Sequence, residues 1–275
     1  MHRRIFLGAL ALGAIGAFGA GAAIGDDFYT PPPPPLIPRA AGMPRLSPHP
    51  RPKPFALPPR FIPPMLERVS LPGATLHGLP GDGNLVALTV DDGGSSECVA
   101  LYAQWCVDSG MRVTFFLNGS LPAWTDNAAA LAPLVANGQV QLANHTWSHA
   151  DLRQLSTGGI QDELLRNGDF IRDTYGVEAA PYYRPPFGYS DDRVRAAAAA
   201  VGYTQPVMWY GSLADSGLIS DADLLQYAND WLLAQHIVIG HANWPTVTRH
   251  FEDLAGIIRS RGLVPVTLDD VFLRP

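Results

Sequence analysis

Seven acidic, imidazole and guanidinium side chains stand at or shortly after the ends of apolar runs within residues 73–275. Short apolar runs bounded by polar residues predict buried strands. In folds built on parallel strands, the side chains that follow the strands gather at one edge of the sheet. We therefore expect these seven side chains to converge on one face of the domain. The set comprises Asp91, Asp92, His145, His149, Arg184, Asp215 and His241.

His145 and His149 have the spacing H-x-x-x-H. On one helical turn this spacing places two imidazoles on the same side, about 6 Å apart, which suits one metal ion. Such a pair alone is also common on protein surfaces, and Asp91-Asp92-Gly93 alone is equally consistent with a solvated turn. One carboxylate from another strand end would complete the donor set typical of a catalytic Zn²⁺ or a similar divalent ion.

These residue types match what hydrolysis of an amide requires. A bound metal lowers the pKa of water towards ~7. A carboxylate can take the proton of that water, and a histidine can protonate the leaving amine. A histidine beside an acid stays protonated near neutral pH, and donors aimed at the developing oxyanion complete the requirements. The sequence contains a candidate for each role.

Apolar runs alternate with segments of helical periodicity, which predicts an α/β domain with a parallel sheet. The domain is short for eight units, so a seven-unit or open version of a (β/α) barrel is expected. The expected strands are 85–90, 112–117, 140–143, 205–209, 236–239 and 263–266, with a seventh near 180–183. The expected helices are 95–109, 160–175, 191–201 with Ser190 as N-cap, 221–233 and 247–261.

The first 72 residues have a different composition. Residues 31–64 hold 15 of the 26 prolines. Residues 1–25 combine Arg3 and Arg4 with a long uncharged run, a pattern typical of a twin-arginine export signal; a cleaved signal and a retained membrane anchor are both consistent with it. Residues 26–72 are interpreted as a basic, proline-rich linker, whose tract 31–64 would extend up to roughly 100 Å, and 73–275 as the catalytic domain. We expect an exported protein of the cell envelope or the medium.

Charge and cysteine content place further limits on the function. Residues 73–275 carry eleven Lys and Arg against twenty-two Asp and Glu, which argues against a nucleic-acid substrate. Cys98 and Cys106 lie eight residues apart on one expected helix, roughly 12 Å, which is beyond disulfide reach. We expect two free thiols packed as small apolar groups. The nucleophile motif G-x-S-x-G does not occur in the sequence, which argues against a serine hydrolase.

Ordered motifs across residues 84–271 resemble those of the polysaccharide deacetylases, the NodB-homology family, also called carbohydrate esterase family 4. The segment Val113–Gly119 is similar to the second-strand signature of that family. The resemblance implies a distorted (β/α) barrel with fewer than eight units. The motifs are Thr89-Val90-Asp91-Asp92-Gly93, Asn144–His149, Arg184-Pro185-Pro186-Phe187-Gly188 and Ile239-Gly240-His241.

The same resemblance implies a role for each residue. Asp91 would be the general base, and Arg184 would pair with it. His241 would be the general acid, with Asp215 beside it. Asp92, His145 and His149 would hold the metal, and the backbone N–H near Phe187 would stabilise the oxyanion. Apart from the resemblance, Pro186, Trp147 and Tyr189 are further candidates for contact with the substrate.

Two positions depart from the family pattern: Val90 stands where Phe is usual, and Ser216 where Trp is usual. The second departure puts the role of Asp215 and the wall of the groove in question. We expect a monomeric, metal-dependent hydrolase, with Zn, Co or another divalent ion, that removes N-acetyl groups from a glycan polymer. Peptidoglycan N-acetylglucosamine is the leading substrate. Chitin-type oligomers, an O-acetylated glycan, or a catalytically weak glycan-binding module are the alternatives.

Overall fold

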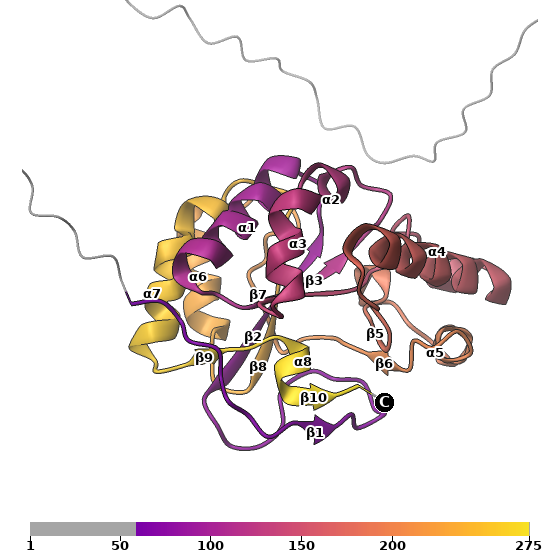
Figure 1. The fold of residues 1–275 in the computed structure, drawn as a ribbon, viewed down its shortest axis with the longest axis horizontal. Helices are drawn as coiled ribbons and strands as arrows, with labels where there is room; N and C mark the ends of the chain where they lie inside the picture. The colour runs from indigo at the N-terminus through magenta and orange to yellow at the C-terminus, as the bar shows by residue number, and fades with distance from the viewer. Residues whose placement is uncertain (1–58, 275) are drawn as a thin grey trace, which may run out of the picture. The chain divides into compact units, whose positions relative to one another are not determined.

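A parallel β-sheet runs through the domain, and helices pack on its outer side (Figure 1). The computed structural model describes residues 59–274. The strand order is β6-β5-β4-β3-β2-β8-β7, β9 also pairs with β2, and β1 forms a separate parallel pair with β10. The strands are β1 (Val69–Ser70), β2 (Leu85–Asp92), β3 (Val113–Leu117), β4 (Val140–Asn144), β5 (Tyr182–Tyr183), β6 (Gln205–Pro206), β7 (Gly211–Ser212), β8 (His236–His241), β9 (Val264–Pro265) and β10 (Phe272–Leu273).

The helices follow the strands in an alternating order, as parallel neighbours require. Three short 3₁₀ turns, Leu152–Gln154, Pro186–Gly188 and Val247–His250, interrupt the connections. The α-helices are α1 (Ser96–Ser109), α2 (Ala123–Asp126), α3 (Ala128–Ala136), α4 (Thr157–Tyr175), α5 (Asp192–Ala199), α6 (Asp221–Trp231), α7 (Phe251–Ser260) and α8 (Leu268–Val271).

Strand β2 separates two apolar cores. Leu88 and Val90 belong to the cluster that packs against the helices, whereas Ala87 belongs to the cluster inside the curled sheet. Side chains alternate between the two faces of a strand, so Thr89 and Asp91 continue the interior series. Both are buried, and the carboxyl end of the strand therefore delivers a carboxylate to the inside of the sheet.

The predicted fold class, a distorted (β/α) barrel of about seven units, is confirmed. Strand Gln205–Pro206 is shorter than expected, and α2, α3, α8 and the two-residue strands β1, β7 and β10 were not predicted. The N-cap of α5 is Asp191, whose carboxylate accepts from the Val194 N–H, and not Ser190. The prediction of two free thiols is confirmed, because Cys98 and Cys106 are both free and buried on α1.

The residues before β2 contact the domain in several places. Phe61 donates its backbone N–H to the Ser109 carbonyl at 2.7 Å, so residues 59–72, which composition assigned to the linker, lie against the domain. Leu76 forms an isolated β-bridge with Val207, beside β6, and Gly78 forms one with His236 in β8. Residues 59–274 contain no helix with the length and apolar character needed to cross a bilayer. The predicted export segment, 1–25, and residues 26–58 of the predicted linker lie outside the described residues.

Candidate active site

Strand register brings the predicted residues to one edge of the sheet. Asp91 at the end of β2 lies opposite His241 at the end of β8. His145 and Arg184 come directly after the paired ends of β4 and β5. Asp215 follows β7 by three residues. The expectation that these groups converge therefore agrees with the parallel topology.

Asp91 and Arg184 form a buried ion pair. The Arg184 Nη1 lies 2.5 Å from Asp91 Oδ1, and both side chains are almost fully inaccessible to solvent. The same guanidinium donates to Thr89 Oγ1 at 3.0 Å and, through Nε, to the Val207 carbonyl at 2.9 Å. Because these contacts fix the guanidinium, they also fix the orientation of the Asp91 carboxylate.

Asp92 lies between two imidazoles. Its Oδ1 is 3.4 Å from Nε2 of His145 and 3.4 Å from Nε2 of His149. This oxygen is buried without a hydrogen-bond partner among the described residues. One ligand atom from each of the three residues lies within 4.8 Å of the others.

The histidine tautomer agrees with metal ligation. His145 Nδ1 lies 2.8 Å from the Arg184 carbonyl. A carbonyl can only accept, so Nδ1 carries a proton, and Nε2 is the ring nitrogen that faces Asp92. Metal-ligating histidines commonly have this arrangement. An orphaned buried carboxylate oxygen and two imidazole nitrogens make a donor set that fits a divalent ion.

The two histidines do not share a helical turn, as the spacing had suggested. Residues 145–149 form an irregular loop in which Thr146 and His149 have φ of 71° and 60°. The loop brings the ring centroids to 4.9 Å. Asn118 holds it in place by donating from Nδ2 to the carbonyls of His145 and Thr146, at 2.6 and 3.1 Å.

His241 and Asp215 form a further hydrogen-bonded pair. His241 Nδ1 lies 3.0 Å from Asp215 Oδ1, and the His241 backbone N–H donates to Asp215 Oδ2 at 3.2 Å. Asp215 is buried. The carboxylate fixes the proton on Nδ1 and leaves Nε2 for the cavity. Ser216 in place of Trp therefore does not displace Asp215 from His241.

Burial and neighbouring charges shift the pKa values of several groups at this site. Burial alone would raise the pKa of Asp92, but the neighbouring imidazoles of His145 and His149, with a hydrogen bond from Asn243, hold that pKa well below its usual range. Burial and the neighbouring imidazole of His145 lower the pKa of His149. Burial also opposes protonation of His241, yet the Asp215 hydrogen bond and the nearby aspartates outweigh it and raise the pKa of His241.

Five of the seven predicted groups line a cavity of about 470 Å³, the catalytic cavity. Phe187 lies at its rim, 57% exposed, with its ring 4.6 Å from that of His149. The residue has φ of 60°, which turns its backbone sharply after Pro186. The lining comprises Asp91, Asp92, His145, His149, Phe187, Gly188, Trp209, Ser212, Ser216, Ile239 and His241.

Three predicted substrate contacts lie outside that lining. Pro186 is buried. Trp147 packs under the Arg166 guanidinium, 4.0 Å from its ring centroid, and Tyr189 packs under the Arg153 guanidinium at 3.9 Å. These contacts could not be predicted from the sequence, because each arginine lies in a different segment of the chain from the aromatic residue that it covers.

Sequence reasoning missed Asn243 and Trp209. Asn243 donates from Nδ2 to Asp92 Oδ2 at 2.7 Å and accepts from the Gly94 N–H at 2.8 Å. Trp209 forms part of the wall of the catalytic cavity. Asn243 comes two residues after His241 at a strand end, and this position could have indicated that it belongs to the site.

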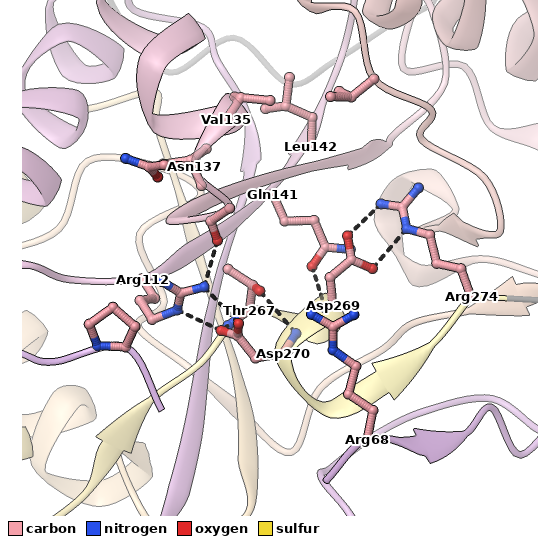
Figure 2. A pocket seen from close by; sticks show the side chains of 14 residues that line it. Arg68, Arg112, Val135, Asn137, Gln141, Leu142, Thr267, Asp269, Asp270 and Arg274 are labelled. Atoms are coloured by element: carbon pink, nitrogen blue, oxygen red, sulfur yellow. Dashed lines mark hydrogen bonds and ion pairs between the residues drawn. The ribbon is translucent and has the colours of Figure 1, made fainter. Parts of the chain in front are cut away.

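A separate cavity of about 300 Å³ lies at the amino ends of β3 and β4. Figure 2 shows two ion pairs among its charged side chains, Arg112 with Asp270 and Arg274 with Asp269, each at 2.6 Å. Arg112 also donates to the Gly138 carbonyl. The Arg112–Asp270 pair ties the start of β3 to α8, at the edge of the sheet opposite the candidate active site.

Comparison with known proteins finds relatives of the domain. Residues 79–206 match the model of the polysaccharide deacetylase family, which confirms the resemblance seen in the motifs. Chitin deacetylase 1 of Cryptococcus neoformans var. grubii is 33% identical over 174 residues, which cover 63% of this chain and 35% of that relative. The chain thus spans about a third of the length of this relative.

Solved structures share the fold. A peptidoglycan N-acetylglucosamine deacetylase has a TM-score of 0.63 at 20% identity, covering 74% of this chain and 94% of that one. A carbohydrate esterase family 4 pseudoenzyme from Bacillus anthracis has a TM-score of 0.64 at 20% identity, covering 74% and 72%. At these identities the likeness shows the fold alone.

Proposed function

We propose that this chain, whose domain belongs to the polysaccharide deacetylase family, is a metal-dependent hydrolase that removes N-acetyl groups from an amino-sugar polymer. One observation carries the proposal: a single cavity collects a carboxylate and two imidazoles suited to a metal, a second carboxylate held by a buried arginine, and a histidine paired with a buried acid. These are the groups that amide hydrolysis needs.

Asp91 acts as the general base. Arg184 occupies its Oδ1, and its Oδ2 lies 3.5 Å from His145 Nε2, at the centre of the cluster. A carboxylate in that position can take a proton from a water placed between the two aspartates. Arg184 is a positioning residue, because its other donors are committed to Thr89 and Val207.

Asp92, His145 and His149 would hold one divalent ion, for which Zn²⁺ is the first candidate because of the nitrogen-rich donor set. Such an ion supplies Lewis-acid chemistry, polarising the acetyl carbonyl and making water more acidic. The three residues come from two strand ends and are held by neighbouring backbone groups, so the site is preorganised by the fold.

His241 acts as the general acid. Asp215 orients the imidazole and raises its pKa, which favours the protonated form of His241. Its Nε2 can then donate to the leaving amine. The backbone N–H of Phe187, beside His149 at the rim, is the proposed donor to the oxyanion.

Peptidoglycan N-acetylglucosamine is the proposed substrate. The proline-rich, basic segment and the export-like N-terminus support a protein that acts in the cell envelope, attached to the membrane where that N-terminal segment is retained. The resemblance in fold to a peptidoglycan N-acetylglucosamine deacetylase is consistent with this choice. The identity to a chitin deacetylase makes chitin-type oligomers the alternative substrate.

Acetate release tests the proposal directly. The full chain, loaded with Zn²⁺, should release acetate from peptidoglycan and from N-acetylglucosamine oligomers, and a chelator should abolish this release. Re-addition of Zn²⁺ or Co²⁺ should restore it. Tyr227→Ala on α6, an exposed aromatic outside the cavity, is the matched control and should behave as wild type. Release that survives the chelator would refute the metal mechanism.

A second candidate is a glycan-binding module without turnover. The likeness in fold to a family pseudoenzyme supports this candidate. That function predicts binding of the oligomers by the metal-loaded chain with no acetate released from any of them, including O-acetylated glycans.

A further inference from the structure

A second hollow opens beside the catalytic cavity and shares Asp92 and His149 with it. Its volume is about 530 Å³. We call it the flanking groove. Its remaining lining consists of Gly94, Asn118, Leu121, Asn243 and Trp244.

We propose that the flanking groove binds the sugar unit next to the one that is deacetylated, with the Trp244 indole stacked on the face of that sugar. The inference rests on the proposed function, because it takes a polymer as the substrate. Two hollows that meet at the candidate metal ligands provide one place for the reacting sugar and another for its neighbour.

A hydrogen bond links Trp244 in the flanking groove to the wall of the catalytic cavity. Trp244 lines the flanking groove and is 43% exposed. Its Nε1 donates to the backbone carbonyl of Ser216 at 3.3 Å, and Ser216 lines the catalytic cavity. This bond restricts the orientation of an exposed ring, so little side-chain entropy remains to be lost when a ligand packs against it. Aromatic rings contribute large apolar contact areas of the kind that the CH face of a pyranose can cover.

The polar lining of the flanking groove suits a neutral, hydroxylated ligand. It contains no Lys or Arg, so it offers little to a phosphate or a sulfate. Asn118 commits its Nδ2 to the carbonyls of His145 and Thr146, while its Oδ1 is buried without a partner within residues 59–274. An unpaired buried acceptor is unfavourable, and a sugar hydroxyl is the kind of donor that could pair with it.

The test compares full-length wild type with Trp244→Ala, Trp244→Phe and the control Tyr227→Ala, each loaded with zinc. The substrate is the β-linked tetramer of N-acetylglucosamine, and acetate release gives kcat and KM. Trp244→Ala should raise KM about tenfold, the loss expected for an aromatic anchor, with kcat within about twofold. Trp244→Phe should recover most of the difference, and Tyr227→Ala should leave both constants unchanged. Zinc content measured by elemental analysis should be equal in all four proteins.

The outcomes separate this inference from the proposed function. An unchanged KM in Trp244→Ala, or a fall in kcat alone, overturns the subsite while leaving the deacetylase intact. If the wild type releases no acetate, the proposed function fails, and calorimetric binding of the same tetramer then decides the subsite. Binding that weakens about tenfold in Trp244→Ala supports it. Equal binding in the two proteins, or no binding to wild type, overturns it.

Discussion

Removing the Asn243 side chain should weaken metal binding without removing a ligand. The Nδ2 of Asn243 donates to Asp92 Oδ2 at 2.7 Å, which leaves Oδ1 as the oxygen directed at the histidines. A hydrogen bond to an ionised group contributes about 1.5–3 kcal/mol. Asn243 is only partly buried, so water can replace part of the bond and the lower end applies. About 1.5 kcal/mol corresponds to a roughly tenfold rise in Kd, within the range of about 10–100-fold reported for groups that support metal ligands.

The assay is isothermal titration of zinc into the metal-free full chain, with a competing chelator of known affinity for tight binding. Asn229→Ala is the matched control: it removes an equivalent amide from α6, where the side chain donates to the Leu225 carbonyl. Thermal unfolding of each metal-free protein checks that the fold is retained. A Kd for Asn243→Ala within twofold of wild type, in a folded protein, would refute the idea that Asn243 orients Asp92.

Three further predictions follow from the remaining contacts. Asp91→Asn should abolish acetate release while bound zinc stays near one equivalent; loss of the metal would mean that the two aspartates have the opposite roles. Asp215→Asn should lower the pKa of His241, because it removes the carboxylate that raises it; the alkaline limb of the kcat profile should therefore move to lower pH, and an unmoved limb would show that His241 is not the acid. Arg112→Ala should lower the free energy of unfolding by about 3 kcal/mol, because it leaves the Asp270 carboxylate without its ion-pair partner in a partly buried site. The kcat should stay unchanged. A stability loss below about 1 kcal/mol in urea unfolding would contradict this.

Much of the fold and the membership of the site follow from the sequence. The apolar runs locate the central strands because these strands are buried on both faces, and the polar residues that follow them meet because the register of parallel strands is continuous. Helix α3 was not predicted because its Ala-rich segment contains Pro133 and its faces differ little in hydrophobicity. Strand β7 is only Gly211–Ser212 and leaves no pattern to read.

The local backbone at the site could not be predicted. An H-x-x-x-H pair indicates a helix by its spacing, but Thr146 and His149 adopt positive φ in a loop. That conformation is fixed by Asn118, which lies 27 residues from His145 in the sequence and bonds the loop carbonyls. Likewise, Asn243 supports Asp92 from 151 residues away. Single-sequence patterns describe neighbours along the chain, whereas these contacts depend on which strands become adjacent.

The placement of Asp91 and Asp92 shows how the backbone assigns different roles to two adjacent, chemically identical residues. Consecutive side chains of a strand point to opposite faces, so Asp92 would continue towards the helices if β2 stayed regular. Instead Asp92 has φ of 71° and Gly93 has φ of 99°, and the Trp124 indole donates to the Asp92 carbonyl at 2.8 Å. A Cβ on Gly93 would lie 2.4 Å from that indole, so glycine is required there. The turn brings the second carboxylate to the histidines while the first stays with Arg184. The tryptophan that closes the turn is therefore part of what separates the proposed base from the proposed metal ligand.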